Sequence, residues 1–399
     1  SLALYATKKP FFTVFSYLVG KNAVLFANGT VAADPPCLFG TGQALPLGLE
    51  TGGRDVDIYA EITVDVAARM ATSRGDVSLL ESYHKLLGVY LGKVACERGF
   101  IGDEAMIRNC PSISDAFIGP YAVVDGPVLL KNACLLSTAE EPTRVQGGAL
   151  VTDSVLQWGC HVDSMAIVEI SVLCEHSSAE RHGKVIGSIL GPNTSVAEGE
   201  VTASLVGPFV GFHHQALLIA AYWPEGKGNV GYGANIGSNH TSRLPDQEIR
   251  PGEGNFFGLG TNIKFPSDFS LAPYSIIATG ATTLPQKVTF PFSLINTPTA
   301  RLDAIPPAFN EIVPGWVLAR NMFMVRRNED KYVKRNKASR LKFDPETLRP
   351  EIVDMMLRAR KALAGVSGKE IYTKKDIPGL GKNYLLDASR KTGVEIYTF

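Results

Sequence analysis

Two adjacent histidines, His213 and His214, are the residues of this sequence best suited to acid–base chemistry. They lie in the stretch GPFVGFHHQALLIA, among glycines and other small residues. The pKa of an imidazole is near neutrality, so it can take up and release a proton at physiological pH. Neighbouring side chains of a strand point to opposite faces, so we expect one ring to reach the outer surface and favour His214. The alternative is a pair of hydrogen-bonded structural histidines.

Polar residues that could bind a substrate follow these histidines. Asn235 lies in GANIGSN, and Asn239, His240, Arg243 and Arg250 lie in or beside the next loop. The asparagines and His240 could hold hydroxyl or phosphate groups, and the arginines could bind an anion through paired hydrogen bonds. The alternatives are a hydrogen-bonded turn or internal asparagine stack, and solvated loop positions for the arginines.

The candidate residues are embedded in a six-residue apolar repeat. A period of six fits neither an amphipathic helix, with 3.6 residues per turn, nor a simple alternating strand. It fits a β-solenoid whose coil has three flat faces and one six-residue segment per face. The repeat includes Ile101, Ile107, Ile113, then after a one-residue slip Ile118, Val124, Leu130, Leu136, and later Leu150, Leu156, Val162, Val168, Cys174, Val206, Phe212, Leu218, Val230, Ile236, Phe257, Ile263, Leu271 and Ile277.

The segment before the repeat, residues 1–98, is predicted to be a mixed, partly helical cap. Apolar spacing predicts helices over 61–71 and 77–95, the second with Asp76 as its N-cap. We expect these helices to cover an open end of the solenoid, because an uncovered coil exposes strand edges.

The repeat itself occupies residues 99–297, and residues 298–399 form a Pro-rich linker followed by a basic and helical segment. A helical stretch is predicted to run to about Ala364 and to end at Gly365. The basic run within 320–340 is interpreted as a solvated or subunit-contact face, and the alternative is contact with the phosphates of a CoA-type donor.

The composition excludes several classes of function. Lys plus Arg equals Asp plus Glu at 39 each, which gives no electrostatic reason to expect a nucleic-acid partner. The six cysteines form no C-x-x-C pair, so we expect reduced core thiols in a cytoplasmic protein. No apolar run is long enough for a membrane span, and we expect a soluble protein.

The six-residue repeat resembles the left-handed parallel β-helix of the hexapeptide-repeat acyltransferases. The order GFHHQALL, GANIGSN, NFFGLGTNIKFP and SIIATGATT is similar to the acetyltransferase half of the bifunctional bacterial enzyme that makes UDP-N-acetylglucosamine. GPFVGFHHQALLIA, GANIGSNHTSR, RPGEGNFFGLGTNIKFP and FPFSLI resemble, over nearly the whole chain, a large bacterial hexapeptide-repeat family that is a domain of unknown function.

This resemblance implies a mainly β, left-handed parallel β-helix with flanking helical segments, assembled as a homotrimer. It implies transfer of an acyl group, from acetyl-CoA or another acyl-CoA, to a small sugar-type substrate in a cleft between subunits. His213 or His214 would be the base, and Asn235 matches the asparagine that contacts the sugar. An aromatic residue and a phosphate-binding lysine of that acetyltransferase have no clear counterpart here, which weakens the implied amino-sugar phosphate specificity.

Two other readings stay open. One is a non-catalytic scaffold or a sugar-nucleotide-binding protein. The other is a zinc site of carbonic-anhydrase type, for which we expect no metal because the histidine spacing does not match that family. The histidines that such a site could draw on are His161, His176, His182, His213, His214 and His240.

Overall fold

The structure is a computed structural model of the 399-residue chain. It describes residues 3–4, 13–14, 16–238, 248–299, 302–341 and 343–398. The chain forms two compact units, Ser1–Pro208 and Phe209–Phe399, which we call the N-terminal unit and the C-terminal unit.

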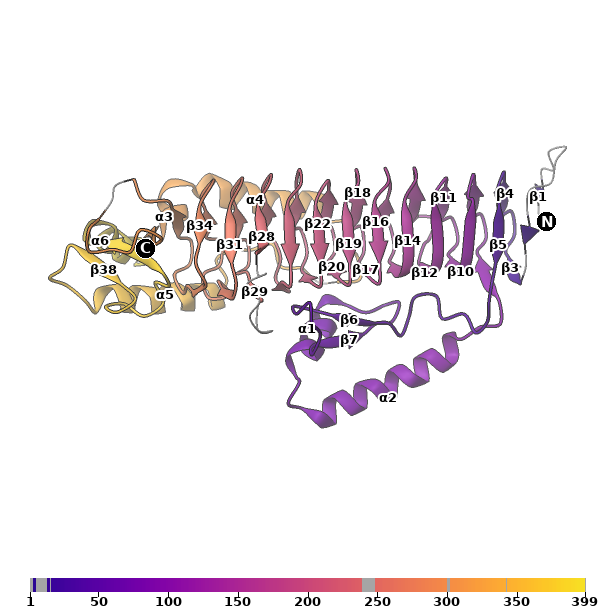
Figure 1. Ribbon diagram of the computed structural model, residues 1–399, viewed down its shortest axis with the longest axis horizontal. Helices are drawn as coiled ribbons and strands as arrows, with labels where there is room; N and C mark the ends of the chain where they lie inside the picture. Colours follow the sequence, from indigo (N-terminus) through magenta and orange to yellow (C-terminus); the bar gives the residue numbers. More distant parts are fainter. Residues whose placement is uncertain are drawn as a thin grey trace. The chain divides into compact units, whose positions relative to one another are not determined.

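The N-terminal unit is a stack of parallel β-coils with three faces, so the predicted parallel β-solenoid is confirmed (Figure 1). The first face consists of β1 (Ala3–Leu4), β4 (Val24–Phe26), β9 (Met106–Arg108), β11 (Val123–Asp125), β13 (Arg144–Gln146), β15 (His161–Val162), β18 (Ser178–Glu180) and β21 (Ser195–Ala197). The second consists of β2 (Thr13–Val14), β5 (Thr30–Ala32), β16 (Ile167–Glu169), β19 (Lys184–Ile186) and β22 (Glu200–Thr202). The third consists of β3 (Tyr17–Val19), β8 (Gly99–Ile101), β17 (Val172–Leu173), β20 (Ile189–Leu190) and β23 (Leu205–Val206). Three longer strands bend across the second and third faces: β10 (Ser112–Ile118), β12 (Leu129–Leu135) and β14 (Leu150–Leu156).

The coils repeat with a period that differs from three full hexads. Ile107 pairs with Val124, and Val145 pairs with Val162, so each of these coils advances the chain by 17 residues. The one-residue slip in the sequence therefore recurs in successive coils. It lies at the corner between the second and third faces, where a single residue with positive φ turns the chain. These corner residues are Asp115, Asn132, Asp153, Ile170, Gly187 and Ala203.

Buried serines form a hydrogen-bonded ladder along the inner side of the same corner. The backbone N–H of Ser171 donates to Ser154 Oγ at 3.0 Å, Ser188 N–H donates to Ser171 Oγ at 3.1 Å, and Ser204 N–H donates to Ser188 Oγ at 3.0 Å. All four side chains are buried. The ladder satisfies backbone donors that the corner would otherwise leave unpaired.

An insertion between β5 and β8 carries β6 (Ala44–Pro46), β7 (Asp55–Asp57), α1 (Val64–Thr72) and α2 (Val77–Val94). Asp76 caps α2, accepting from Leu79 N–H at 3.0 Å, as the sequence predicts. Gln157 Nε2 donates to the carbonyls of Ala60 and Ile62, which ties the insertion to the middle of the stack. The helices therefore lie along the flank of the coils and not over an open end, and β3, β4 and β5 already belong to the coils (Figure 1).

The C-terminal unit continues the same architecture. Its first face consists of β24 (Gly211–Phe212), β27 (Asn229–Val230), β30 (Phe256–Phe257), β33 (Ile276–Ile277) and β36 (Leu294–Asn296). The second consists of β25 (Leu217–Ile219), β28 (Asn235–Ser238), β31 (Asn262–Lys264) and β34 (Thr282–Thr283), and the third of β26 (Tyr222–Trp223), β29 (Ile249–Arg250), β32 (Ser267–Asp268) and β35 (Gln286–Lys287).

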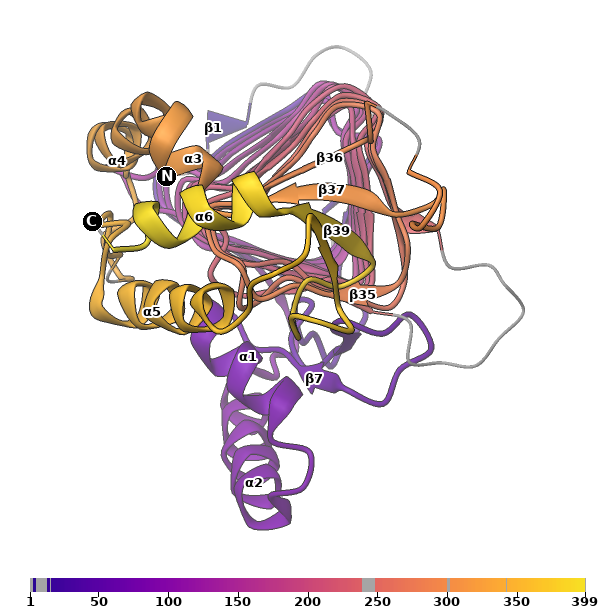
Figure 2. The same ribbon diagram turned by 90° about the vertical axis from the view of Figure 1, so that its left-hand side faces the viewer.

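The last coil of this unit is closed by an antiparallel strand. β37 (Asn310–Val313) pairs with β36, and β39 (Asn383–Leu386) and β38 (Ile371–Thr373) extend the sheet, with α6 (Asp387–Ile396) against them (Figure 2). This arrangement covers the edge that the final coil would expose. Three more helices belong to the unit: α3 (Trp316–Arg320), α4 (Met322–Arg335) and α5 (Pro350–Ala364), the last ending at Gly365 as predicted. Among the described residues, none of the helices has the length and apolarity needed to span a bilayer.

Candidate functional site

His213 and His214 form the turn that leads from β24 to β25. Phe212 points into the core, so the next side chain, His213, points outward. His214 and Gln215 have φ angles of 45° and 61°, which end the strand before alternation can direct His214 inward. Both imidazoles are consequently exposed, whereas we expected only one to reach the surface.

The backbone of this turn is not special to the histidines. Ser164–Met165 and Arg181–His182 make the corresponding turn in the N-terminal unit with φ angles of 51° to 63°. A left-handed residue pair is therefore how this solenoid turns from its first to its second face. Any chemistry at the turn must come from the side chains and their surroundings.

The ring of His213 lies back over Gly211. A Cβ atom at Gly211 would be 3.1 Å from His213 Nε2 and 3.3 Å from Asn229 Nδ2. Asn229 lies in the next coil and pairs with Gly211, so the amide of Asn229 and the imidazole of His213 face the same space above Gly211. Glycine leaves that space open, and a larger residue would crowd both polar groups.

Helix α4 places a lysine beside this imidazole. Tyr332 packs against Phe209, with ring centroids 5.0 Å apart, and its hydroxyl donates to the carbonyl of Lys227 at 2.6 Å. These contacts fix the end of α4 on the coils. Lys331, the preceding residue, is half-buried, and its charge acts on His213. We call Gly211, His213, Asn229 and Lys331 the His213–Lys331 surface.

The electrostatics of this surface favour a neutral imidazole. Partial burial of the ring, followed by the charges of His214 and Lys331, lowers the pKa of His213 from its usual value of 6.5. A histidine with a lowered pKa is mostly deprotonated at pH 7. It can then accept a proton without first losing one.

His214 lies beside an exposed aromatic residue of the next coil. The ring centroids of His214 and Tyr232 are 6.4 Å apart, and those of His213 and His214 are 6.2 Å apart. Tyr232 is 53% exposed, which is high for a tyrosine side chain. An exposed ring of this kind can stack on the apolar face of a ligand.

Asn235 faces outward from β28, between the buried residues Ala234 and Ile236. It pairs with Asn262 in the following coil. The Oδ1 atoms of both asparagines are buried and have no hydrogen-bond donor among the described residues. Asn235 lies one coil below the histidine turn, since it pairs with Leu217. The structure thus brings Asn235 to the same side of the coil as His213 and His214.

Arg250 lies elsewhere. It belongs to β29 on the third face, where its Nε donates to Glu248 at 3.2 Å and its guanidinium lies 5.5 Å from the centre of the Tyr222 ring. The structure does not bring it to the histidines. Asn239, His240 and Arg243 lie outside the described residues.

Lys227, whose carbonyl accepts from Tyr332 of α4, belongs to a buried ionic cluster around Glu253. Glu253 accepts from Lys227 Nζ at 2.6 Å, from Tyr274 Oη at 2.7 Å and from Arg349 Nη2 at 2.5 Å. Burial alone would raise the pKa of the Glu253 carboxyl, but hydrogen bonds from Arg349 and Lys227 outweigh it and hold the pKa below its usual value. Lys227 also donates to the carbonyl of Asp344, so the cluster fastens the chain before α5 to the coils.

The histidines of the N-terminal unit have different neighbours. His176 Nε2 lies 3.0 Å from Glu141 Oε1, and His161 Nε2 lies 3.2 Å from Asp163 Oδ2. His182 is exposed on a turn. Within the parts of the chain that the structure describes, no group of three His, Cys, Asp or Glu side chains is arranged to hold a metal ion.

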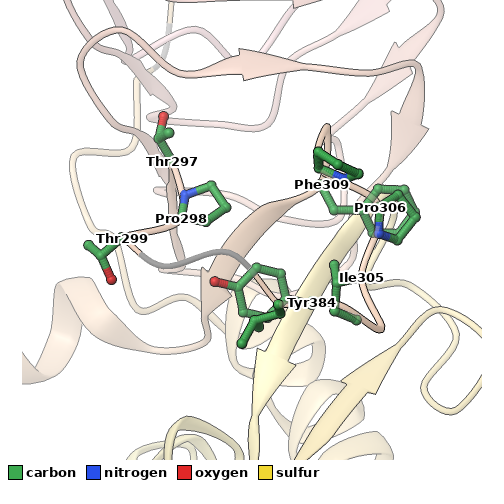
Figure 3. A pocket seen from close by; sticks show the side chains of 9 residues that line it. Thr297, Pro298, Thr299, Ile305, Pro306, Phe309 and Tyr384 are labelled. Atoms are coloured by element: carbon green, nitrogen blue, oxygen red, sulfur yellow. The ribbon is translucent and has the colours of Figure 1, made fainter.

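A cavity of about 290 Å³ lies near the end of the C-terminal unit (Figure 3). Tyr384 lies between Pro298 on one side and Ile305 and Pro306 on the other. Its lining contains threonine, proline, apolar and tyrosine side chains, with no histidine, carboxylate or amine. It offers no general base, so it does not compete with the His213–Lys331 surface as a catalytic site.

Sequence reasoning missed Asn229, Tyr232 and Lys331. Asn229 and Tyr232 come one coil after Gly211 and His214, and their spacing of 18 residues was an available signal. Lys331 is more than a hundred residues from His213, and the basic run was interpreted as a solvated or subunit-contact face. Nothing in the sequence indicates which of its cations meets the imidazole.

A family model described as "Domain of unknown function (DUF4954)" matches residues 12–367. The chain belongs to this family. The DUF4954 match includes the coils, the histidine turn and α4, whereas β38, β39 and α6 follow it.

A protein of Treponema pallidum (strain Nichols), described as "Uncharacterized protein", is 27% identical to this DUF4954 chain over 332 residues. The alignment covers 80% of this chain and 45% of the relative, so the chain spans less than half of the relative's length. No solved structure matches the chain.

Proposed function

We propose that this DUF4954 protein is an acyltransferase that moves an acyl group from acetyl-CoA or another acyl-CoA to a sugar-type acceptor. The acceptor is an amino sugar, a sugar phosphate or a nucleotide sugar, and the acylated group is an amine or a hydroxyl. The observation that carries this proposal is the position of the His213 imidazole above Gly211 and beside Asn229, together with its lowered pKa. Such a base is ready to accept a proton at pH 7.

In the proposed reaction His213 Nε2 takes the proton from the acceptor amine or hydroxyl as that group attacks the thioester carbonyl. The tetrahedral intermediate carries its negative charge on the former carbonyl oxygen, and the amide of Asn229 is a candidate donor to it. The C–S bond then breaks, the acyl group stays on the acceptor, and the thiolate leaves with the proton from the imidazolium. The products are the acylated sugar and free CoA.

The acceptor would lie along the same side of the coils. Tyr232 offers an exposed ring for stacking, and Asn235 an amide close to the turn. Asn239, His240 and Arg243 are proposed to complete the substrate contacts, because they are polar or basic residues of the predicted loop that follows Asn235 in the sequence. Arg250 is on another face of the coil, so it would reach this substrate only across a subunit boundary.

Left-handed coils, a hexapeptide-type repeat and a cytoplasmic homotrimer are also part of this proposal, and they rest on the resemblance. In a trimer each histidine turn would face a neighbouring subunit, which would enclose the thioester. Light scattering on the purified protein should give three times the chain mass of 42.9 kDa.

The function is tested by following thiol release from acetyl-CoA in the presence of a panel of amino sugars, sugar phosphates and nucleotide sugars. We expect turnover with at least one acceptor, lost in His213→Ala and kept in His182→Ala. His182 is a matched control because it is an exposed histidine in the corresponding turn of the N-terminal unit. Equal turnover in wild type and in the His213→Ala/His214→Ala double variant would remove these residues from the mechanism. Binding of a nucleotide sugar without turnover would favour a non-catalytic binding protein.

A further inference from the structure

Helix α4 carries a row of cations toward its C-terminal end. Arg327, Lys331 and Arg335 are spaced by four residues, so their side chains lie on one face of the helix. No carboxylate among the described residues lies within ion-pair distance of any of them, whereas Lys334 on the same helix pairs with Asp330 at 3.6 Å. Like charges at this spacing destabilise a helix, and only Arg335, in the last turn of α4, gains from the helix dipole.

The row is held in place. Tyr332 is 2% exposed and Val325 is 2% exposed, so two turns of α4 are packed into the unit. Val325 belongs to the core cluster that also contains Tyr274, Phe292 and Val317. The backbone that carries the three cations is therefore fixed, with Lys331 half-buried and the side chains of Arg327 and Arg335 exposed. Burial, followed by the charges of Arg335 and Arg327, lowers the pKa of Lys331, which indicates that the three groups are crowded.

The row lies near the proposed base, because Tyr332, the residue after Lys331, packs against Phe209, four residues before His213. Lys331 is the cation whose charge acts on His213, and the imidazole and Asn229 face the space above Gly211. A ligand whose reactive end lies at His213 would therefore meet Lys331 first and the two arginines next. Three cations at positions i, i+4 and i+8 span about 12 Å along a helix, which is long enough for more than one phosphate group.

We propose that Arg327, Lys331 and Arg335 bind the phosphate groups of the ligand that reacts at His213. This inference rests on the proposed function and names the charged part of its substrate: a phosphate or diphosphate ester. Guanidinium groups bind phosphate oxygens through two parallel hydrogen bonds, and an ammonium group adds a point charge between them. The phosphates belong to the CoA thioester or to a phosphorylated sugar, and the choice of probe separates these two sources.

The experiment measures binding by calorimetry for the full chain, without any acceptor turnover. The probes are inorganic pyrophosphate, CoA, pantetheine and a nucleotide sugar. The test variants are Lys331→Gln and the triple variant R327Q/K331Q/R335Q. The control is Lys334→Gln, which removes a cation of the same helix that already has a carboxylate partner. Melting temperatures without ligand verify that every variant is folded.

We expect pyrophosphate and CoA to bind, pantetheine to bind at least tenfold more weakly than CoA, and the triple variant to lose at least tenfold affinity for both phosphate probes. Lys334→Gln should change these affinities less than twofold. A nucleotide sugar that loses affinity while CoA does not would assign the row to the acceptor. Unchanged affinity of the folded triple variant for every probe, or an equal loss in Lys334→Gln, would overturn the inference.

The two proposals fail in different ways. If His213→Ala abolishes acyl transfer while the folded triple variant keeps its affinity for each probe, the acyltransferase proposal is supported and the phosphate-binding role of Arg327, Lys331 and Arg335 is excluded. If phosphate binding depends on the three cations but no acyl-CoA supports transfer to any acceptor, the cations form an anion-binding site and the acyltransferase proposal is excluded.

Discussion

The histidines of the two units have different surroundings, although each unit also has an exposed histidine in the turn from its first to its second face, His182 in one and His213 and His214 in the other. In the N-terminal unit His176 and His161 lie within 3.2 Å of Glu141 and Asp163, which makes them members of structural polar pairs. In the C-terminal unit His213 lies over a glycine, with His214 and Lys331 as its charged neighbours. The comparison teaches that the solenoid supplies position only. Partial burial of the His213 ring, then the charge of His214 and then that of Lys331 on α4, lower the pKa of His213 and favour its neutral form.

The largest expected effect is on catalysis. Replacing His213 by alanine should lower acyl transfer by about 10²- to 10⁴-fold, because the acceptor proton then has no positioned base. Replacing His176 by alanine should leave the rate within about twofold, since His176 is committed to Glu141. Rates are measured by thiol release. Comparable losses in both variants would erase the distinction between the two units.

The next largest effect is on stability. Glu253→Gln should lower the free energy of unfolding by about 3–5 kcal/mol, because Lys227 and Arg349 would keep their charges without a buried carboxylate. The half-exposed pair of His161 and Glu180, 3.9 Å apart, should contribute less than about 1 kcal/mol. Urea unfolding of Glu253→Gln and Glu180→Gln compares the two, and a similar shift in both would contradict the account.

The same carboxylate predicts a pH dependence. The pKa of Glu253 is lower in the folded state than in the unfolded chain. Its contribution to stability is therefore complete above the unfolded pKa, about 4.3, and is lost as the pH falls through the lowered folded value. The melting temperature of wild type should approach that of Glu253→Gln as the pH is lowered from 6 to 2.5. A difference between the two that stays constant would show that the carboxylate is not responsible.

A smaller effect is expected when His213 is given a carboxylate neighbour like those of His161 and His176. Lys331→Glu places a carboxylate where the cation lies, so the protonated imidazole is favoured and the pKa of His213 rises. Acyl transfer at pH 7 should fall by about twofold, and the acid limb of its pH profile should move to higher pH. Lys334→Glu is the control. A profile that does not move would separate the base from this lysine.

The sequence predicted the solenoid because its core positions are set by local geometry. A chain that turns every five or six residues must place an apolar side chain inward at each face, as Ile107, Ile113 and Ile118 do. The strict period of six was too regular, since Asp115 and its equivalents shorten one step per coil. The position of the helical insertion was not predicted correctly. It is held by two hydrogen bonds from Gln157 to Ala60 and Ile62, which are 97 and 95 positions away in the sequence.

The candidate site was predictable only in part, for a similar reason. His213 and His214 stood out because they are adjacent imidazoles, and Asn235 because GANIGSN resembles a motif of the acetyltransferases. The solenoid brings Asn235 near the turn because Asn235 pairs with Leu217 in the preceding coil. Lys331 reaches the same place through α4, whose position depends on Tyr332 meeting Phe209. Composition classed its basic run as a solvated or subunit-contact face, and no periodic pattern could show which cation turns toward the coils.

The most direct measurement is the pKa of the His213 imidazole, obtained by NMR titration of the histidine ring protons in wild type and in Lys331→Gln. We expect a value below 6.5 in wild type and a small rise when the lysine is neutralised, because the charge of Lys331 acts on His213 after burial and the charge of His214. A value at or above 6.5 in wild type would contradict the claim that His213 is a neutral base, and the same value in both proteins would remove Lys331 from the causes of the lowered pKa.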